Sequence, residues 1–423
     1  MKILIVNTSD LVGGAAIAAQ RLMKALKAEG ADVQMLVLKA KSVDSPDVAS
    51  LPNKWAKRLA FLYERIVIWV NNHFSRQNLF AVSIANTGFD ITALPQFQQA
   101  DVIHLHWINQ GFLSLGNLTK IMQSGKKIVW TMHDMWAFTG ICHYAGNCMK
   151  YRTWCDFCPM LTMSSQHDLS SKVFQLKQKL FQYPLTIIGC SQWIANLAKE
   201  SLLLRNQNIL SIPNPIDTEL FRPLNSKSQL KAKFGLPNDK FLFLFCSQKV
   251  TDSRKGMNYL FEALEYLAKN YPDETSRIGL VVLGGKATSL SSLNSRPSSL
   301  VSRLSIKLMP YISSPNDMAE IYNAVDAFIT PSLQDNLPNT IMESLSCGLP
   351  CIGFNVGGIP EMIDHLQNGY VASCESSVDL AKGMLWLISH PDYKSISDSA
   401  RSKVLENYSP HIVAQRMLKV YNA

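Results

Sequence analysis

Residues 2–30 read KILIVNTSDLVGGAAIAAQRLMKALKAEG, and they predict a strand, a turn and a helix in succession. The opening KILIVN is an apolar run typical of a strand that is buried on both faces. Gly13 and Gly14 then mark a turn, and the apolar residues after them recur at helical spacing up to the closing Gly30. Such a strand–turn–helix unit is the building block of doubly wound α/β domains.

The same pattern repeats along the chain in two series. In the first series, apolar segments typical of buried strands occupy residues 31–38, 100–108, 126–134 and 185–192. In the second series they occupy residues 240–249, 277–285, 324–332 and 348–355. Strands that alternate with helices predict parallel sheets covered by helices on both faces. The sequence therefore predicts an α/β protein with two doubly wound, Rossmann-like domains.

Composition changes along the chain predict where the two domains meet. Residues 213–240 are rich in proline and polar residues, which is typical of an interdomain linker. We expect an N-terminal domain over 1–212, a C-terminal domain over 241–395, and a C-terminal helix over 396–423 that crosses back to the N-terminal domain. The Ser-rich segment 288–299 is expected to be an exposed loop.

The overall composition suits a folded protein with an anionic partner. Apolar residues make up 47% of the 423-residue chain and charged residues 17%, which is enough to build packed cores. The 41 Lys and Arg against 32 Asp and Glu leave a net charge of +9, which favours nucleotides, phosphorylated lipids or membrane surfaces as partners. Nucleic acid is not expected, because the sequence shows no arginine-rich run, helix-turn-helix pattern or aromatic RNA-binding signature.

Two segments bear on cellular location. The start, MKILIVNTSD, turns polar too early for a secretory signal, so we expect a cytoplasmic protein whose nine cysteines are thiols or metal ligands. Residues 54–70, KWAKRLAFLYERIVIWV, are strongly apolar, but Glu64 and Arg65 interrupt them, so no spanning helix is expected. We favour a buried, core-facing helix here over an interfacial membrane helix. Peripheral contact with the inner face of the membrane stays open.

Polar residues just after strands point to binding sites, because ligands of open parallel sheets bind beyond the carboxyl ends of the strands. Gly13 and Gly14 could present helix N-terminal amides to a phosphate or a sugar hydroxyl, although a plain tight turn explains them equally well. Their spacing is not the GxGxxG of dinucleotide binding. His133 and Asp134 follow a later strand, where a histidine can orient a hydroxyl or transfer a proton.

The segment VIHLHW holds two further histidines, His104 and His106, which compete with His133 for such a role. A histidine in an apolar strand is more often structural than catalytic. We expect these two to be core residues or to support the site indirectly.

A cluster of cations follows the first strand of the second series. In CSQKVTDSRKGMNYLFEAL, Lys249, Arg254 and Lys255 precede a segment with helical spacing. Cations at a helix start oppose the macrodipole, which costs about 0.3–1 kcal/mol each. An anion is therefore expected to compensate them, and a diphosphate would do so, whereas a solvated surface cluster is the alternative.

Residues 332–350, SLQDNLPNTIMESLSCGLP, place Asp335 and Glu343 on either side of an NLPNT loop. A capping box at Thr340 and Glu343 would explain only one of these acids. The loop could aim several amides at a phosphate, while Glu343 could accept hydrogen bonds from ribose hydroxyls and Asp335 could meet a sugar ring. Together with a further glycine turn at Gly357–Gly358, this pattern favours a nucleotide that carries a sugar.

In these motifs the chain resembles the family 4 glycosyltransferases, retaining enzymes of the GT-B architecture, over nearly its whole length. Members carry two acids separated by seven residues: Glu343 matches the second, and Asp335 stands where the first is usually Glu. The resemblance implies two Rossmann-like domains that face a central cleft, the N-terminal one on the acceptor side and the C-terminal one binding the nucleotide sugar. It also implies that Glu343 binds the ribose, Asp335 the transferred sugar, and the amides between them the diphosphate.

The resemblance assigns roles to further residues. Lys255 matches the family's phosphate clamp, and Lys249 stands where Arg is common, which loses a bidentate contact. The implied catalytic residues are His133, Lys255 and Asp335. The implied donor-binding residues are Gly14, Lys249, Arg254, Lys255, Asp335, Asn336, Leu337, Pro338, Asn339, Thr340 and Glu343. The implied acceptor-binding residues are Gly13, Gly14, His133 and Asp134.

A cysteine-rich insertion over residues 140–160 follows the strand-end histidine. The segment HDMWAFTGICHYAGNCMKYRTWCDFCP is similar to a subset of bacterial polysaccharide-building transferases, including colanic-acid-type enzymes. Four of its cysteines could hold a structural zinc ion tetrahedrally, or they could be packed free thiols. These cysteines are Cys142, Cys148, Cys155 and Cys158. No catalytic metal is expected.

The resulting hypothesis is a retaining glycosyltransferase of polysaccharide biosynthesis. It would move a sugar from a nucleotide-diphosphate sugar to a hydroxyl of a glycan or a lipid-linked glycan. Two alternatives stay open: a sugar-nucleotide epimerase on the same scaffold, and a non-catalytic nucleotide-sugar-binding protein.

Overall fold

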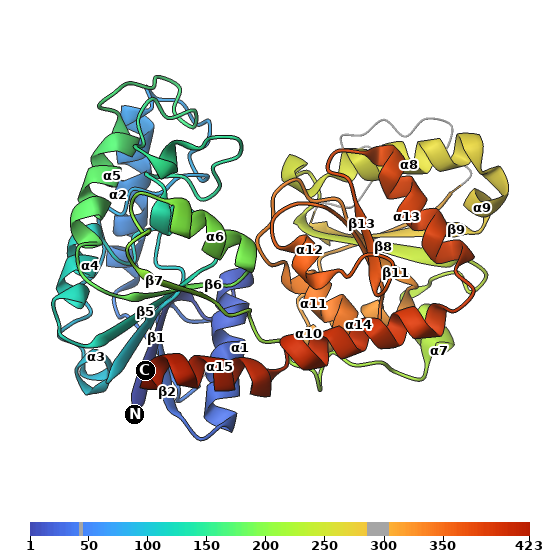
Figure 1. The fold of residues 1–423 in the computed structure, drawn as a ribbon, viewed down its shortest axis with the longest axis horizontal. Coiled ribbons are helices and arrows are strands. Elements are labelled where there is room, and N and C mark those ends of the chain that lie inside the picture. The colour runs from blue at the N-terminus through green and yellow to red at the C-terminus, as the bar shows by residue number, and fades with distance from the viewer. Residues whose placement is uncertain (42–44, 286–303) are drawn as a thin grey trace. The chain divides into compact units, whose positions relative to one another are not determined.

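The chain divides into two compact units (Figure 1). The first comprises Met1–Pro215 with Pro410–Ala423, and the second comprises Ile216–Ser409. The computed structural model describes residues 1–41, 45–285 and 304–423, without the side chain of Lys249. The expected Ser-rich loop at 288–299 lies outside the described residues.

The first unit is built on a seven-stranded parallel sheet of order β3-β2-β1-β4-β5-β6-β7. Its strands are β1 (Lys2–Ser9), β2 (Asp32–Lys39), β3 (Val48–Ser50), β4 (Val102–Leu105), β5 (Lys127–Met132), β6 (Thr186–Gly189) and β7 (Asn208–Ser211). Its helices are α1 (Gly14–Ala28), α2 (Lys54–Asn71), α3 (Pro95–Gln99), α4 (Leu115–Met122), α5 (Leu169–Leu180), α6 (Gln192–Glu200) and α15 (Pro410–Asn422), with short 3₁₀ turns η1 (Trp136–Phe138) and η2 (Lys150–Arg152).

The second unit is built on a six-stranded parallel sheet of order β10-β9-β8-β11-β12-β13. Its strands are β8 (Phe241–Lys249), β9 (Ile278–Gly285), β10 (Ser305–Met309), β11 (Ala327–Thr330), β12 (Cys351–Phe354) and β13 (Gly369–Ala372). Its helices are α7 (Lys227–Phe234), α8 (Met257–Asn270), α9 (Pro272–Ser276), α10 (Pro315–Ala324), α11 (Asn339–Ser346), α12 (Ile359–Met362), α13 (Ser377–Ser389) and α14 (Tyr393–Asn407), with the 3₁₀ turn η3 (Ser253–Lys255).

Alternate residues of β1 enter two different cores, one on each face of the first sheet. Leu4 and Val6 join the core on one face, and Ile3 and Ile5 join the core on the other, with residues of α1 and α15. A strand that buries both of its faces must be apolar throughout, which explains the KILIV run. The predicted doubly wound, Rossmann-like arrangement is confirmed in both units.

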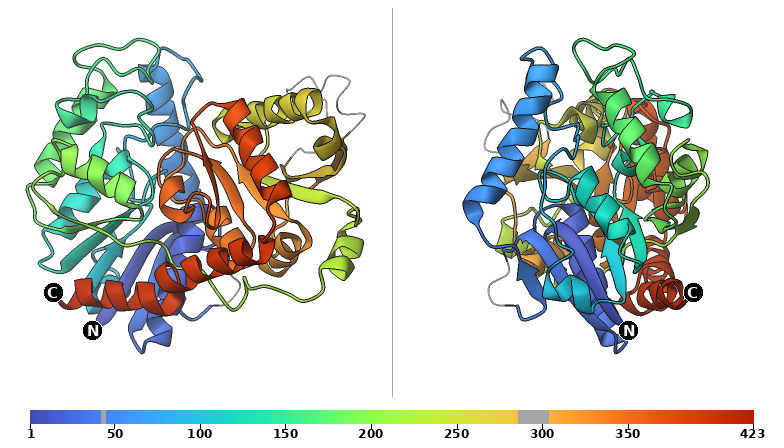
Figure 2. Two further views of the ribbon diagram at one scale, coloured as in Figure 1. Left: turned by 45° about the vertical axis from the view of Figure 1, so that its right-hand side comes forward. Right: turned by 90° about the vertical axis from the view of Figure 1, so that its left-hand side faces the viewer.

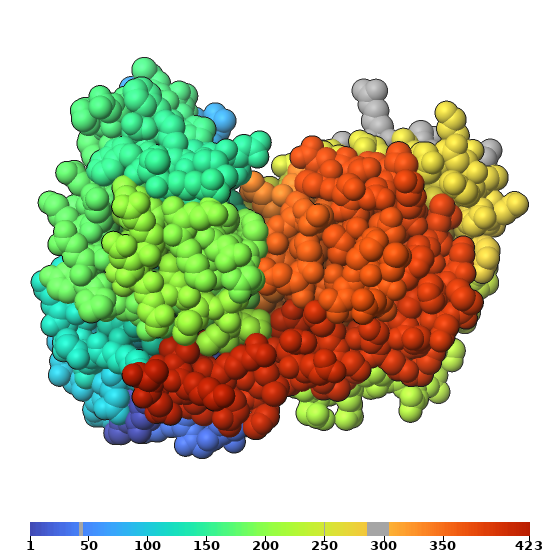
Figure 3. Space-filling model, viewed as in Figure 1, coloured from blue at the N-terminus to red at the C-terminus, as the bar shows by residue number. Residues whose placement is uncertain are grey.

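The C-terminal helix belongs to the first unit. The side chains of Val413 and Met417 on α15 pack in the same core as Leu22 of α1, and α15 runs in dark red along the lower edge of this unit (Figure 3). The helical stretch predicted over 396–423 is two helices, because α14 ends at Asn407 and α15 begins at Pro410. The range predicted as a linker, 213–240, contains the helix α7.

Helix α2 is not the core-facing helix that the sequence analysis favours, and that prediction is wrong. Lys57, Glu64 and Arg65 are buried, whereas large apolar side chains such as Trp55 and Leu59 are exposed. The helix runs along the margin of the first unit (Figure 2, right). Of the helices described, none is both long and apolar enough to cross a bilayer.

Each sheet has one pair of neighbouring strands from which the chain continues toward opposite edges of the sheet. This pair is β1 and β4 in the first unit and β8 and β11 in the second. Loops diverge between the strands of such a pair and leave a crevice beyond the carboxyl ends of the strands, where ligands of open α/β sheets bind. The residues after β1, β4, β8 and β11 are therefore the first to consider as a functional site.

Candidate functional site

In the second unit, the loops after β8 and β11 bring together Lys255 and Asp335. Lys255 ends η3, and Asp335 follows β11 by five residues. The Lys255 Nζ lies 2.6 Å from the Asp335 Oδ2, and the two side chains are 30% and 14% exposed. Both groups thus remain open to a ligand at the point where the sheet reverses its strand order. The structure places two of the three predicted catalytic residues in contact.

Two glycines allow the loop of residues 331–335 to approach this site closely. Gly256 has φ of +69°, and a Cβ there would lie 1.7 Å from the Pro331 carbonyl oxygen. Gly357 has φ of +58°, and a Cβ there would lie 1.6 Å from the Asp335 carbonyl oxygen. Any side chain at either position would push this loop away, and a non-glycine residue disfavours such φ values. The two glycines therefore set the position of Asp335.

Hydrogen bonds between backbone groups hold the same loop on both sides. The Leu333 amide donates to the Arg254 carbonyl at 2.7 Å, and the Gly358 amide donates to the Asn336 carbonyl at 2.8 Å. Three successive loop residues are buried, namely Asn336, Leu337 and Pro338. These hydrogen bonds and the burial of three residues therefore hold the predicted donor-binding loop in place against the second unit.

Glu343 lies on the first turns of α11 and is buried. Its Oε2 accepts a hydrogen bond from the Tyr322 hydroxyl at 3.0 Å. Burial, together with the Glu343 charge, raises the pKa of Tyr322 well above its ordinary value, so the phenol keeps the proton that it donates. Tyr322 was not foreseen, since its position 21 residues before Glu343 gives no signal in the sequence.

The capping-box alternative for Thr340 and Glu343 is wrong. Helix α11 begins at Asn339 with Pro338 as the N-cap residue, and no side chain caps it. The Glu343 carboxylate accepts from Tyr322. The N-terminus of α11 lies four residues after Asp335, and helix N-termini are favourable places for anions.

The chain itself supplies anions for two of the predicted cations. Arg254 pairs with Asp252 through its Nη2 at 2.7 Å and its Nε at 3.2 Å, and Lys255 pairs with Asp335. These two cations therefore have anionic partners within the chain and do not by themselves require an external anion. A ligand would have to compete with Asp252 and Asp335. The side chain of Lys249 lies outside the described part of the structure.

In the first unit, the predicted residues lie along one edge of the sheet. Gly13 and Gly14 follow β1, and His133 and Asp134 follow β5. Gly13 has φ of +91° and is the N-cap residue of α1, without a side-chain cap bond. The turn therefore needs glycine at residue 13 for its backbone conformation, and it leads into a helix N-terminus, where anions are favoured.

His133 contacts His106, the residue that directly follows β4, and β4 lies between β1 and β5 in the sheet. The His106 Nδ1 and the His133 Nε2 are 2.9 Å apart, and their rings are stacked. Burial lowers the pKa of His133 to about 4 and that of His106 well below its ordinary value. Both imidazoles are therefore neutral near pH 7. His106 was expected to be a core or supporting residue, and it is buried beside His133.

His104 is part of the core rather than of the sheet edge. Its Nδ1 lies 2.6 Å from the Tyr421 hydroxyl on α15, and its Nε2 lies 2.8 Å from the Thr131 hydroxyl. Burial lowers the pKa of His104 to about 3. The period of two in a strand places His104 and His106 on the same side, which the HLH spacing already indicates.

Asp134 is surrounded by protein donors. Its carboxylate lies 2.7 Å from the His143 Nδ1, and it accepts from the Trp107 indole at 2.8 Å and from the Trp136 amide at 2.9 Å. Burial alone would raise the pKa of Asp134, but the His143 charge and these hydrogen bonds outweigh it, and the pKa is lowered. The geometry makes Asp134 an anchor of the loop after β5. His143 and Trp107 were not predicted.

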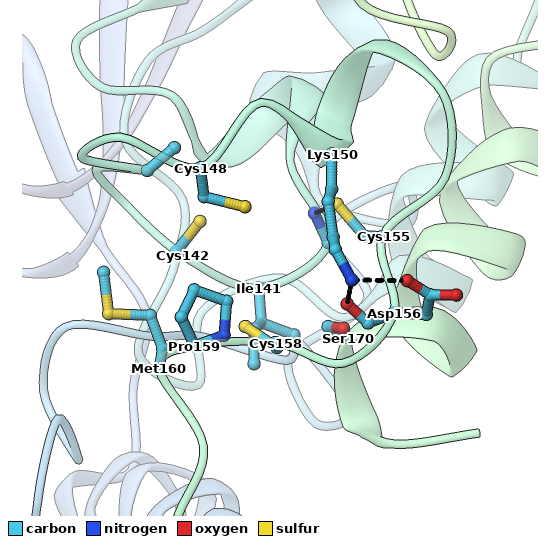
Figure 4. A pocket seen from close by; sticks show the side chains of 12 residues that line it. Ile141, Cys142, Cys148, Lys150, Cys155, Asp156, Cys158, Pro159, Met160 and Ser170 are labelled. Carbon is cyan, nitrogen blue, oxygen red and sulfur yellow. Dashed lines mark hydrogen bonds and ion pairs between the residues drawn. The ribbon is translucent and has the colours of Figure 1, made fainter. Parts of the chain in front are cut away.

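The cysteine-rich insertion surrounds one small hollow (Figure 4). All four cysteines in question line it, and its volume of about 20 Å³ leaves room for about one water molecule. Burial raises the pKa of Cys142 and of Cys155 to about 12 and that of Cys158 to about 11.

The structural zinc ion stays a prediction for these four cysteines. Among the described residues, no group of three or more His, Cys, Asp or Glu side chains could hold a metal ion. The Cys155 sulfur accepts a hydrogen bond from the Gly140 amide at 3.3 Å. None of the four cysteines is part of a disulfide bond.

Comparisons with known proteins agree with this geometry. Residues 226–403 match the family model described as glycosyl transferases group 1, and residues 12–220 match that of glycosyltransferase family 4. A glycosyltransferase of Haemophilus influenzae without an assigned activity is 27% identical over 223 residues, which are 51% of this chain and 57% of that protein. An Escherichia coli UDP-Gal:α-D-GlcNAc-diphosphoundecaprenol α-1,3-galactosyltransferase is 26% identical over 211 residues, 50% of this chain and 53% of that protein. The chain thus spans about half the length of the curated relatives it matches.

Solved structures show the same fold over the whole chain. Sucrose-phosphate synthase of Thermosynechococcus elongatus superposes with a TM-score of 0.68 and 16% identity, covering 100% of this chain and 98% of that one. WaaG, a glycosyltransferase involved in lipopolysaccharide biosynthesis, does so with a TM-score of 0.65 and 14% identity, covering 100% and 99%. Anabaena HepE in complex with UDP and glucose gives 0.63 and 15%, also covering 100% and 99%. The chain belongs to the family 4 glycosyltransferases and has the GT-B type of fold, with two Rossmann-like units.

Proposed function

We propose that the protein transfers a sugar from a nucleotide-diphosphate sugar to a hydroxyl of a glycan or a lipid-linked glycan, with retention of the anomeric configuration. The observation that carries this proposal is the pairing of Lys255 with Asp335, close in the chain to the N-terminus of α11 and to the buried Glu343. An ammonium group and helix amides suit a diphosphate, and two carboxylates suit sugar hydroxyls.

The diphosphate would take the place of Asp335 as the partner of Lys255. In the reaction, the bond between the sugar C1 and the diphosphate oxygen breaks, and a bond from C1 to the acceptor oxygen forms. Negative charge then grows on the departing diphosphate, and Lys255 with the first amides of α11 would stabilise it. Asp335, released from Lys255, would accept hydrogen bonds from the transferred sugar. Glu343 would hold the ribose in the orientation that Tyr322 fixes.

His133 would orient a hydroxyl rather than remove its proton. With a pKa of about 4, a neutral imidazole is a weak base near pH 7. We therefore propose that the acceptor hydroxyl loses its proton to an oxygen of the departing diphosphate. The amides at Gly13 and Gly14 are proposed to contribute to the same binding of hydroxyl or phosphate groups. We propose that the reaction needs no catalytic metal, because protein cations and amides can neutralise the diphosphate.

The choice of substrates for a first assay follows from the relatives. The E. coli relative is named for UDP-Gal and a diphosphoundecaprenol-linked acceptor, and the HepE structure contains UDP and glucose. We propose a UDP-sugar as the donor class and a lipid-linked glycan as the acceptor class.

Product analysis tests the proposal. The protein is incubated with UDP-sugars and a short-chain lipid-diphosphate glycan, and the products are analysed by mass spectrometry and by NMR of the anomeric proton. We expect a lengthened glycan with the anomeric configuration of the donor. An altered sugar that is still attached to UDP would instead show an epimerase. Binding of UDP-sugars with no change in either the UDP-sugar or the lipid-diphosphate glycan would indicate a binding protein.

A further inference from the structure

Helix α2 presents a continuous apolar face to solvent. Six large apolar side chains on it are exposed, at spacings that place them on one side of the helix. They are Trp55 (73% exposed), Leu59 (63%), Leu62 (41%), Tyr63 (56%), Ile66 (53%) and Val70 (47%). Phe74 and Phe80, which follow the helix in the chain, are exposed to a similar extent. Single exposed apolar residues need no explanation, but a contiguous apolar stripe marks a binding surface.

The opposite side of α2 is buried and carries three charged residues beside the core residue Ile68, whereas an ordinary surface helix buries its apolar side. The Lys57 Nζ donates to the Leu38 carbonyl at 2.9 Å. The Glu64 Oε1 accepts from the amides of Ile84 and Ala85 at 2.9 and 3.0 Å. The Arg65 Nη2 pairs with the Glu64 Oε2 at 2.9 Å, and its Nη1 donates to two backbone carbonyls.

These buried bonds prevent α2 from turning its apolar side inward. A rotation about the helix axis would move three charged groups into solvent and leave their backbone partners unpaired inside the unit, which is strongly unfavourable. The apolar face is therefore fixed outward by the fold. Something other than the core of this unit must cover it.

The exposed charges of α2 and of the residues next to it in the chain are all positive. Over residues 53–80 the exposed charged side chains are Lys54, Arg58 and Arg76, and the one acid in this range, Glu64, is buried. An apolar stripe with aromatic residues and flanking cations matches a surface of anionic lipid.

We propose that α2 with residues 72–80 lies on the surface of a bilayer that contains anionic phospholipid. The apolar side chains enter the boundary between headgroups and acyl chains, and Lys54, Arg58 and Arg76 contact the lipid phosphates. A second copy of the chain is a poorer occupant, because a symmetric contact through this face would bring these three cations near the same cations of the other copy. The proposal is independent of the chemistry of the second unit.

Vesicle sedimentation with the full chain tests the proposal. The protein is mixed with vesicles of phosphatidylcholine and phosphatidylglycerol in equal parts, and with vesicles of phosphatidylcholine alone. We expect co-sedimentation with the anionic vesicles that weakens as salt rises. A wild-type protein that stays in the supernatant with anionic vesicles at low salt overturns the proposal.

Paired variants locate the surface. Leu59→Ser with Ile66→Ser should lower partitioning by at least about tenfold, because two apolar side chains no longer leave water. Lys54→Glu with Arg58→Glu should lower binding to the anionic vesicles by about fivefold or more per charge. The matched control, Val378→Ser with Leu405→Ser, changes two side chains of the second unit that are each 42% exposed, and it should bind like the wild type.

Further readouts separate the other occupants. The melting temperature of each variant should match that of the wild type, since the replaced side chains are exposed. A correctly folded α2 variant that binds vesicles as well as the wild type contradicts the proposal. Sedimentation equilibrium without lipid should show a monomer. A dimer that the Leu59→Ser, Ile66→Ser pair dissociates would assign this face to a second copy instead.

Discussion

Lys255 and Asp335 stand 80 residues apart in the chain and meet because parallel strands place all their carboxyl ends at one edge of the sheet. The sequence motifs identified both residues, yet their ion pair could not be read from the motifs. The same holds for Glu343 and Tyr322, whose contact depends on how α10 and α11 pack. Composition and spacing indicate which residues follow strands, whereas the pairing among them is decided by the strand order.

Replacing Lys255 tests the proposed role of its ammonium group. Lys255→Ala should lower kcat/KM for the UDP-sugar by about a hundredfold or more, because one group that stabilises the leaving diphosphate is lost. Steady-state kinetics measures the effect. Lys269→Ala, which removes an exposed lysine at the end of α8, is the matched control and should be neutral. Equal loss in both variants would contradict the assignment.

Replacing Tyr322 tests how Glu343 is oriented. Tyr322→Phe removes the hydrogen bond of 3.0 Å to the Glu343 carboxylate and keeps the ring in place. We expect KM for the donor to rise about three- to tenfold with little change in kcat, because a net hydrogen bond contributes about 0.5–1.5 kcal/mol. Tyr311→Phe on an exposed tyrosine serves as the control. An unchanged KM would show that Glu343 does not need this partner.

Among the elements, the inner strands of both sheets were predictable, but the edge strands β3, β7, β10 and β13 were not, and the prediction for helix α2 was wrong. The spacing of apolar residues along a helix is the same whether the apolar face points inward or outward. This spacing therefore cannot distinguish a helix that packs on the core from one that exposes its apolar face. The deciding groups are Lys57, Glu64 and Arg65, which bond to backbone groups far away in the sequence. The capping-box alternative at the start of α11 fails because the N-cap residue is Pro338, and the Glu343 carboxylate accepts from Tyr322.

Two glycines with similar backbone conformations give a matched test of the loop after β11. Gly256 and Gly235 have φ of +69° and +61°, but a Cβ would collide with the Pro331 carbonyl only at Gly256. Gly235→Ala should cost about 1–2 kcal/mol of unfolding free energy from the left-handed conformation alone. Gly256→Ala should cost clearly more and should also reduce donor binding. Urea unfolding of both variants measures the difference, and equal losses would refute the proposed close approach.

For the whole molecule, the α/β class and the two Rossmann-like units were predictable, because every buried parallel strand leaves an apolar run in the sequence. The residues at which the chain passes from one unit to the other were harder to predict from the sequence. The second unit begins at Ile216 and ends at Ser409, and the chain returns to the first unit with α15. Amphipathic helices do not reveal from their sequence which sheet they cover.

The histidines of the first unit predict how its stability depends on pH. Burial lowers the pKa of His133 to about 4 and that of His104 to about 3 from an ordinary 6.5. Between these values and pH 6.5 the unfolded chain binds more protons, so stability is lost as the pH falls below 6.5. At pH 5 the loss should be roughly 2 kcal/mol for each such histidine. Urea unfolding at pH 7 and pH 5 measures it, and His104→Gln should make the dependence shallower. Equal stability at both pH values would contradict the buried neutral state.

The central claim is that the second unit binds the diphosphate of a nucleotide sugar where its sheet reverses strand order. A crystal structure of the protein with bound UDP tests this claim most directly. The account predicts a diphosphate within hydrogen-bond distance of the Lys255 Nζ and of the first amides of α11, with the ribose at Glu343. A nucleotide bound elsewhere, with Lys255 still paired to Asp335, would contradict it.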